Sequence, residues 1–332
     1  MAASKKKAVR ALGLCSGGLD SILAGLVLRQ QAIEVTWITF ETPFFSAVKA
    51  RAAARQTGIP LIVREITPTY LEMLRNPPSG YGRYMNPCMD CHALMFRLAG
   101  EWMRAQGFDF LFSGEVVGQR PMSQTKSSLR YVEKHSGFDG YILRPLSARN
   151  LPATIPEKEG WVNREGLLDL SGRSRKPQIK LAVEFGIKDY PAPAGGCLLT
   201  DPGYARRLKD LFVHQSETST ADLELLKHGR HFRLDAVTKI IVGRTQRDNE
   251  RIEDIHALDG ETTLRVMDFP GPIVAVRGRP SASILQQAVA ICAGYSKASR
   301  ESVVKVLVSG TDGQQVFETR PIPPDEARAL II

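Results

Sequence analysis

The sequence predicts an α/β protein with two domains. A Rossmann-like, mostly parallel sheet is expected over residues 1–200, and a smaller α+β domain over residues 201–332. Two observations predict this. In the first part short apolar segments alternate with amphipathic ones, which is typical of parallel strands linked by helices. In the second part several short strand-like segments are interleaved with helices, and the size of this part is ordinary for a domain.

The predicted elements follow in chain order. In the first domain, strands are expected over 8–14, 33–40, 60–66 and 108–115, and helices over 22–31, 46–58 and 93–107. Between 116 and 192 the pattern loosens, with a short helix expected after the basic turn GRSRKPQ. In the second domain, short strands are expected within 231–252, 262–269, 271–278 and 303–310, with a helix over 281–296.

Composition bounds the class of protein. The formal net charge of +9 suits a polyanionic partner, although enzymes that never touch nucleic acid also carry such charge. The five cysteines are too sparse for a secreted disulfide scaffold. There is no signal-peptide apolar core and no apolar run of roughly 18 residues, as a membrane span requires. We therefore expect a cytoplasmic protein, without a membrane partner, whose thiols are available for chemistry.

A glycine loop, CSGGLDS, joins the first predicted strand to the first helix. Glycines at such a place let backbone N–H groups approach an anion, and the helix start adds partial positive charge. Ser16 and Ser21 can donate hydrogen bonds, and Asp20 can hold a Mg²⁺ that bridges phosphates. A glycine turn capped by Asp20 or Ser21 is the alternative.

The full SGGxDS string resembles the signature of the PP-loop ATP pyrophosphatase superfamily. That resemblance implies binding of ATP and Mg²⁺ by Ser16, Gly17, Gly18, Asp20 and Ser21, with cleavage between the α and β phosphates. Members adenylate an oxygen of the substrate and release pyrophosphate. Asp20 would then take part directly in catalysis.

A CxxC element, NPCMDCH, precedes the predicted helix at 93–107. Zinc sites, redox dithiols and iron-sulfur clusters all use this spacing. The element and the later GGC resemble the paired cysteines of bacterial tRNA 2-thiouridine synthases, which implies catalytic roles for Cys91 and Cys197. Cys88 stands where that family has aspartate. Three cysteines resemble instead the iron-sulfur branch of tRNA thiolases, which implies a [4Fe-4S] cluster on Cys88, Cys91 and Cys197.

Two alternatives stay open at the cysteines. Zn²⁺ could be bound by the same three cysteines with His92 as fourth ligand, since a closed tetrahedral site needs four. A metal-free persulfide or disulfide relay between Cys91 and Cys197 is the other. Cys15 and Cys292 are expected to be packed core thiols.

Further candidates lie near these motifs. Asp90 could act as a base or orient the target uridine, or it could be a helix N-cap. Gly114 ends the fourth predicted strand, at the edge where such sheets bind ligands, and is expected to contact the adenylate through its backbone. Basic residues of two polar stretches could contact tRNA phosphates: Arg120, Lys126, Arg173, Arg175 and Lys176.

Longer strings, among them GEVVGQRPMSQ and PAPAGGCLLTDP, resemble thiouridylase-like or ThiI-like proteins with a C-terminal module related to the RNA-binding NFACT-R (DUF814) domain. The resemblance implies ATP-dependent thiolation of a tRNA uridine, at C2 or C4, with sulfur from an unidentified sulfide or persulfide donor. Two other functions remain as hypotheses: a C–N ligase or amidase with structural zinc, and a non-catalytic RNA-binding protein.

Overall fold

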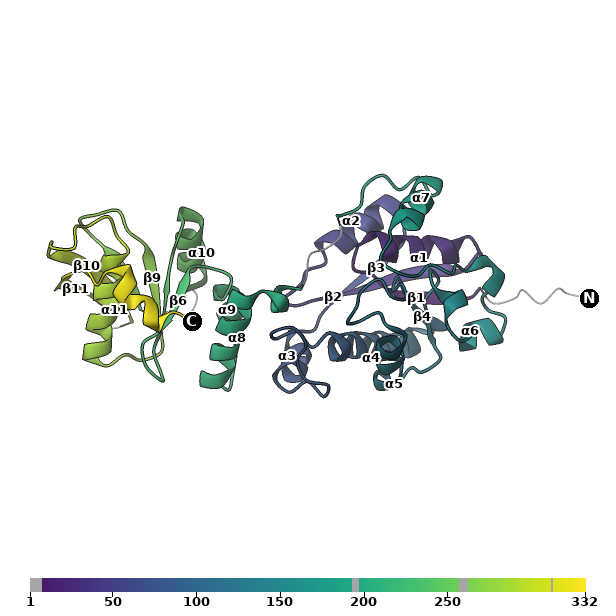
Figure 1. Ribbon diagram of the computed structural model, residues 1–332, viewed down its shortest axis with the longest axis horizontal. Coiled ribbons are helices and arrows are strands. Elements are labelled where there is room, and N and C mark those ends of the chain that lie inside the picture. The colour runs from purple at the N-terminus through teal and green to yellow at the C-terminus, as the bar shows by residue number, and fades with distance from the viewer. Residues whose placement is uncertain (1–7, 193–196, 257–261, 312) are drawn as a thin grey trace, which may run out of the picture. The chain divides into compact units, whose positions relative to one another are not determined.

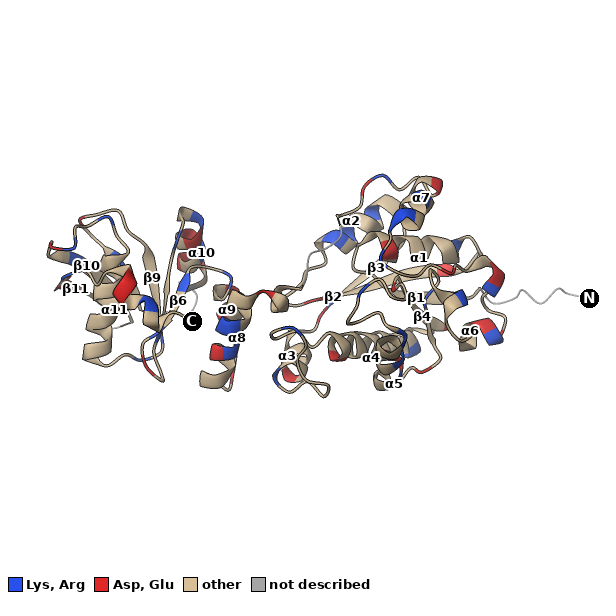
Figure 2. Cartoon of the chain, in the orientation of Figure 1, with Lys and Arg blue, Asp and Glu red and all other residues tan. Residues whose placement is uncertain are grey.

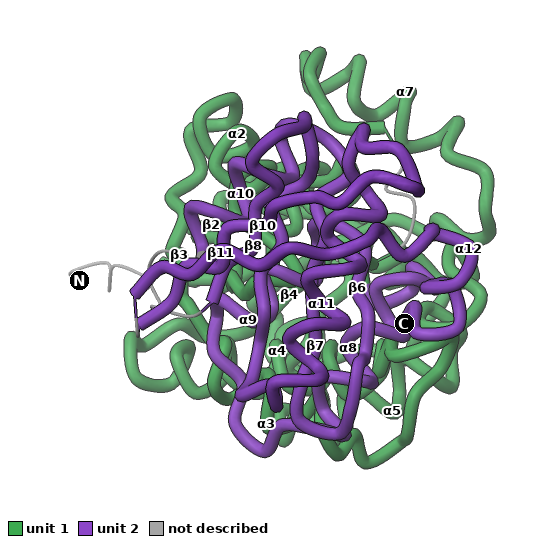
Figure 3. Tube along the Cα trace, turned by 90° about the vertical axis from the view of Figure 1, so that its left-hand side faces the viewer, with its two compact units in different colours: residues 1–198 green, residues 199–332 purple. Residues whose placement is uncertain are grey.

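The structure, a computed structural model, describes residues 8–192, 197–256, 262–311 and 313–332. The chain divides into two compact units, Met1–Leu198 and Leu199–Ile332 (Figure 3). The sequence-based boundary was placed at residue 200. Within the described residues no helix is both long and apolar enough to cross a membrane.

The first unit is built on a five-stranded sheet whose strands are all parallel. The order is β3-β2-β1-β4-β5, with bounds β1 Arg10–Leu14, β2 Glu34–Glu41, β3 Leu61–Glu65, β4 Phe110–Ser113 and β5 Ile142–Leu143. The central strands are almost wholly apolar and buried, as expected for strands covered on both faces. The predicted parallel sheet is confirmed.

Helices cover both faces of this sheet (Figure 1). On one face lie α1 Leu19–Arg29, α2 Val48–Thr57 and α7 Lys176–Glu184, and on the other lie α3 Thr67–Arg75, α4 Cys88–Gln106 and α5 Lys126–Ser136. The core on the α1 face contains Trp37 and Phe112, both nearly inaccessible to solvent. A short helix, α6 Ile155–Lys158, and two 3₁₀ turns lie in the segment between β5 and α7.

The cysteine element differs from the prediction. The helix that was expected to begin at residue 93 begins at Cys88, with Pro87 as its N-cap. The CxxC therefore forms the first turn of α4 instead of a loop before it. A proline before the first helical turn ends the preceding loop without competing for a helical hydrogen bond, because the first N–H groups are unpaired there.

The second unit is a six-stranded antiparallel sheet with helices. The order is β11-β10-β8-β9-β7-β6, with β6 Arg230–Arg233, β7 Lys239–Val242, β8 Thr263–Val266, β9 Ile273–Arg277, β10 Val304–Gly310 and β11 Gly313–Thr319. Its helices are α8 Pro202–His214, α9 Thr220–Leu225, α10 Gln246–His256, α11 Ala282–Gly294 and α12 Pro324–Ala327. The predicted α+β class is confirmed, but residues 246–252 of α10 lie in a segment predicted to hold short strands, and β11 was not predicted.

Candidate functional site

The glycine loop lies at the carboxyl end of β1, where open parallel sheets bind ligands. Gly17 has φ +71°, and a Cβ there would lie 2.2 Å from the backbone carbon of Lys49 at the start of α2. Gly18 is the N-cap of α1, and no side chain caps the helix. Tight packing on α2 and an uncapped helix start leave a backbone surface suited to an anion.

The two serines of the loop make local hydrogen bonds. Ser21 Oγ donates to the Gly18 carbonyl at 2.8 Å, and Ser16 Oγ accepts the Gly18 N–H at 3.3 Å. Ser16 is exposed, whereas Ser21 is buried. Of the two predicted phosphate donors, Ser16 therefore has the more accessible hydroxyl.

Asp20 is oriented by two glutamines that the sequence-based interpretation did not single out. Gln119 Nε2 donates to Asp20 Oδ2 at 2.7 Å, and Gln178 Nε2 donates to Gln119 Oε1 at 3.0 Å. Asp20 Oδ1 is buried without a hydrogen-bond partner. Buried carboxylate oxygens are normally satisfied, and Mg²⁺ prefers oxygen ligands, so this oxygen fits a bound Mg²⁺.

Gly114 packs against the same helix. A Cβ at this position would lie 2.4 Å from the Asp20 carbonyl and from the Ser21 nitrogen. The end of β4 therefore touches the first turn of α1, which requires glycine there. Gly114 therefore lies beside the glycine loop. Its backbone contact to the adenylate stays a prediction.

Three cysteines lie within electrostatic range of one tyrosine hydroxyl. Tyr70, on α3, is 1% exposed, packs against Phe44 and Phe45, and hydrogen-bonds the Cys91 sulfur. Burial raises the pKa of Tyr70 well above its ordinary value, and the sulfurs of Cys91, Cys197 and Cys88 contribute to the rise. Tyr70 is therefore a donor at neutral pH, and the three predicted cysteines are near neighbours although they lie far apart in sequence.

The surroundings of Cys91 favour its neutral thiol. Burial raises the pKa of Cys91 to about 12; the Tyr70 hydrogen bond opposes this rise, and Cys197 and Cys88 add to it. Cys15, Cys88, Cys91 and Cys292 are free of disulfide bonds. Among the described residues no group of three or more His, Cys, Asp or Glu is spaced to hold a metal ion. Three thiols are the kind of ligand that an iron-sulfur cluster uses. The two glycines that precede Cys197, Gly195 and Gly196, lie outside the described residues.

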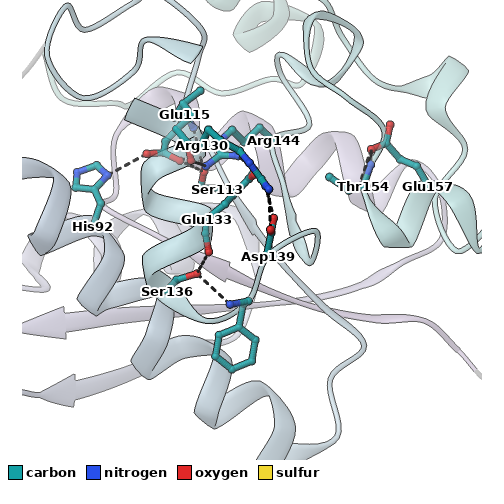
Figure 4. Close-up of polar contacts among 12 residues, drawn as sticks. His92, Ser113, Glu115, Arg130, Glu133, Ser136, Asp139, Arg144, Thr154 and Glu157 are labelled. Carbon is teal, nitrogen blue, oxygen red and sulfur yellow. Dashed lines mark hydrogen bonds and ion pairs between the residues drawn. The ribbon is translucent and has the colours of Figure 1, made fainter. Parts of the chain in front are cut away.

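His92, the alternative zinc ligand, is bound on one side to a carboxylate (Figure 4). Its Nδ1 lies 2.9 Å from Glu115 Oε1, and Arg144 Nε donates to Glu115 Oε2 at 3.0 Å. Burial opposes ionisation of Glu115, but Arg144 and His92 outweigh it and lower the pKa to about 2. Glu115 is therefore ionised, and His92 Nδ1 is the donor.

Arg144 anchors this network in the interior. Its side chain is 1% exposed and also pairs with Glu133 of α5. Arg130 then bonds Glu133 and Asp139 (Figure 4). A buried guanidinium held by two carboxylates fixes the end of β4 relative to α4 and α5.

Asp90 lies within the first turn of α4, so the N-cap interpretation is wrong; Pro87 is the cap. Both carboxylate oxygens are occupied. Oδ2 accepts from Ser79 N at 2.9 Å and from Ser79 Oγ at 2.6 Å, and Oδ1 accepts from the Tyr131 hydroxyl at 2.9 Å. Asp90 thus connects the loop before α4, the cysteine turn and α5.

Two predicted basic stretches meet in space. Val117 pairs with Ser171, and Gly172 N donates to the Val117 carbonyl at 2.8 Å. The loop bearing Arg120 therefore lies beside the one bearing Arg173, Arg175 and Lys176, and both are linked to Asp20 through Gln119 and Gln178. Arg175 Nε is buried without a hydrogen-bond partner.

Lys126 lies apart from those loops, at the start of α5. It lines a cavity of about 630 Å³ between α5 and the segment 148–158, together with Arg130, Leu151 and Lys158. No predicted site residue other than Lys126 lines this cavity.

Tyr70, Gln119, Gln178 and Arg144 were missed at the sequence level. Gln119 and Gln178 do fall in the quoted strings GEVVGQRPMSQ and GRSRKPQ, but neither has a charge or motif position that signals a role. Tyr70 sits in an amphipathic helix where an aromatic residue ordinarily indicates core.

The strand, glycine loop and helix at the carboxyl edge of a parallel sheet define the first unit as a nucleotide-site α/β domain of the PP-loop type. Comparison with known families supports this. Residues 7–151 match the family model described as Thiamine biosynthesis protein (ThiI), and residues 229–331 match the model described as NFACT protein RNA binding domain. Most of the first unit is therefore similar to the ThiI family and most of the second to the NFACT-R domain, which confirms the resemblance stated from the motifs.

Curated relatives agree. The chain is 26% identical over 232 residues to the tRNA-specific 2-thiouridylase MnmA of Rippkaea orientalis, covering 65% of this chain and 63% of that protein. It is 32% identical over 114 residues to the tRNA-specific 2-thiouridylase MnmA 3 of Bacteroides fragilis, covering 33% of this chain and 32% of the relative. The chain thus spans less than two thirds of the length of these relatives.

Among solved structures, a predicted subunit of tRNA methyltransferase from Methanocaldococcus jannaschii aligns with a TM-score of 0.35 and 17% identity, over 53% of this chain and 76% of that one. This likeness is too distant to add to the description above.

Proposed function

We propose that the chain is an ATP-dependent tRNA sulfurtransferase that converts a uridine carbonyl to a thiocarbonyl. The observation that carries this proposal is the pair Gly114 and Glu115. Gly114 packs on the Asp20 turn of the glycine loop, and Glu115 binds His92, the residue after Cys91. Two consecutive residues thus connect an activating site with a sulfur site.

The first step is adenylation. ATP lies with its phosphates at Ser16, Gly17 and Gly18, at the uncapped start of α1. Asp20 Oδ1 would hold Mg²⁺, which would neutralise phosphate charge, and Gln119 holds the other carboxylate oxygen. The uridine oxygen, at C2 or C4, attacks the α-phosphorus, and pyrophosphate leaves. The oxygen becomes part of an AMP group, which is a far better leaving group than hydroxide at neutral pH.

The second step is sulfur transfer. A sulfur atom held at the Cys88, Cys91 and Cys197 site attacks the activated carbon, the C–O bond breaks, and AMP leaves. A [4Fe-4S] cluster on the three thiolates would supply one open iron for an external sulfide. In the metal-free version, Cys91 carries a persulfide; its outer sulfur is transferred, and Cys91 and Cys197 end as a disulfide that a thiol reductant must reopen.

The remaining residues bind and position. Tyr70 donates to the Cys91 sulfur and closes the site against Phe44 and Phe45. Asp90, with both oxygens occupied, fixes the cysteine turn, so we assign it a positioning role. Four basic residues on or next to the loops beside Asp20 would contact tRNA phosphates: Arg120, Arg173, Arg175 and Lys176. Lys126, at the start of α5, would add a further contact. The free thiols suit a reducing, cytoplasmic setting.

The test is a reaction with tRNA that lacks thiouridine. Anaerobically purified protein, ATP, Mg²⁺ and sulfide are supplied, and pyrophosphate, AMP and thiouridine are measured. The proposal expects one AMP for each thiouridine. An ATP-cleaving, zinc-loaded protein that makes no thiouridine would favour the ligase hypothesis, and tRNA binding with no ATP cleavage would favour a non-catalytic RNA-binding protein.

A further inference from the structure

The second unit contains a half-buried guanidinium that lacks a carboxylate partner. Arg207 lies on α8; its Nε is buried without a hydrogen-bond partner, and its Nη1 donates to the Gly229 carbonyl at 3.5 Å. Among the described residues, no Asp or Glu lies within salt-bridge distance of this side chain. Removing a cation from water without an anion is costly, so this arrangement calls for an explanation.

A second guanidinium lies close by. Gly229 precedes β6 and Arg244 follows β7, and the register pairs Arg230 with Val242, so the two turns lie at the same end of these strands. Burial lowers the pKa of Arg207, and repulsion from Arg244 lowers it further. The Arg244 side chain is 46% exposed. The two cations are therefore within electrostatic reach of one another.

The nearby carboxylates are already engaged. Asp248 lies 3.1 Å from Arg244 Nε and 3.5 Å from His228 Nδ1. Asp210 pairs with Arg233 and with Lys239. Asp201, whose attraction opposes the fall in the pKa of Arg207, caps α8 by accepting the Tyr204 N–H at 2.6 Å. None of the three lies within salt-bridge distance of Arg207.

A helix, α10, begins beside these groups. Thr245 separates Arg244 from the first residues of this helix, Gln246 and Arg247, which are exposed. Thr245 Oγ1 accepts the Asp248 N–H at 3.1 Å, so the helix start is capped. Figure 2 marks the basic positions along α8 and α10.

We propose that Arg207 and Arg244, beside the start of α10, form a phosphate site that binds the backbone of RNA. This inference rests on the proposed RNA-directed function and names the residues through which the second unit takes part. The family match to an RNA-binding domain begins at residue 229, so Arg207 lies outside it. A free anion such as inorganic phosphate shares the chemistry; the net charge of +9 and the domain match favour RNA.

The experiment uses the full chain and a bulk tRNA preparation, with binding measured over a range of KCl concentrations. Arg207→Gln and Arg244→Gln should each weaken binding about 5- to 20-fold near physiological salt and reduce the slope of log K against log salt by about one. Arg320→Gln, an exposed residue directly after the opposite edge strand β11, makes the same charge change and should alter affinity less than about twofold.

A melting curve separates binding from a structural role. Because Arg207 has no carboxylate partner, Arg207→Gln should keep or raise the melting temperature of the free protein; a clear fall would assign the residue to stability and overturn the inference. Equal tRNA binding by Arg207→Gln, Arg244→Gln and Arg320→Gln would also overturn it, leaving the proposed function intact. If inorganic phosphate stabilises wild type but not Arg207→Gln, and tRNA affinity is unchanged, the site belongs to a free anion. Failure of wild type to bind tRNA would contradict the proposed function itself.

Discussion

The amide of Gln119 donates a 2.7 Å hydrogen bond to Asp20, and the other oxygen of that carboxylate is buried without a hydrogen-bond partner. Gln178 in turn holds Gln119. The aspartate of the glycine loop is therefore fixed from one side and available on the other. We therefore assign a positioning function to Gln119 and Gln178, although neither belongs to a recognised motif.

Gln119→Leu should disturb the Mg²⁺ requirement. Loss of a hydrogen bond to a charged group costs about 1.5–3 kcal/mol, so the Mg²⁺ concentration for half-maximal ATP cleavage should rise roughly 10-fold or more. Binding of ATP in the presence of a chelator should change little. Gln124→Leu is the matched control, because Gln124 is buried on the same loop, whereas the hydrogen bond to Asp20 comes from Gln119. An unchanged Mg²⁺ dependence in Gln119→Leu would remove the positioning role.

Tyr70→Phe should separate sulfur transfer from ATP binding. The variant keeps the ring that packs on Phe44 and Phe45 and removes only the hydroxyl that bonds Cys91. We expect thiouridine formation to fall at least about fivefold, with unfolding free energy within about 1 kcal/mol of wild type. ATP affinity, measured by calorimetry, should be unchanged. Wild-type thiolation by this variant would show that the hydroxyl is dispensable.

Glu115→Gln should change stability and its dependence on pH. The pKa of Glu115 is lowered to about 2 from an ordinary 4.5, so its ionised form stabilises the fold above pH 4.5, and this contribution is lost as pH falls toward 2. Because the variant leaves Arg144 with one carboxylate fewer, unfolding free energy near neutral pH should fall by about 3 kcal/mol or more.

All three tryptophans, Trp37, Trp102 and Trp161, lie in the first unit, so urea unfolding followed by their fluorescence reports on that unit. The variant should also lose stability less steeply than wild type between pH 4.5 and 2. Glu34→Gln is the control, since Glu34 makes an exposed pair with Arg10 at 3.9 Å. Equal stability of Glu115→Gln and Glu34→Gln would contradict the network.

Local pattern was enough to predict the parallel sheet, because each strand from β1 to β4 is a short apolar run followed by a turn and a helix. It was not enough for β11, whose residues Gly313–Thr319 are mostly exposed and polar and gain their strand structure from pairing with β10. The start of α10 was missed because a strand-like run, Lys239–Val242, comes shortly before the helix. The turn between them contains Gly243, which packs against α10: a Cβ there would lie 1.9 Å from Asn249 Oδ1.

At the candidate site, motif spacing predicted the loop residues and the three cysteines. The side chains that orient them could not be predicted, because Tyr70, Gln119 and Arg144 act through contacts between distant segments. Asp90 is a residue whose position in the sequence predicted a different role. Its place between two cysteines predicted a base, a uridine-orienting residue or a helix cap, whereas its hydrogen bonds to Ser79 and Tyr131 connect three segments of the fold.

The most direct test of the central claim compares Cys88→Ser, Cys91→Ser and Cys197→Ser with Cys292→Ala, a core cysteine of the second unit. Anaerobically purified variants are assayed for thiouridine formed on tRNA and, in parallel, for ATP affinity. The account predicts that each of the three serine variants loses thiolation about 100-fold or more, because each removes one sulfur of the transfer site, while ATP affinity is unchanged. Cys292→Ala should retain thiolation. Wild-type thiolation by Cys88→Ser would exclude the cluster and leave the relay between Cys91 and Cys197, whereas wild-type thiolation by Cys91→Ser or Cys197→Ser would contradict the account.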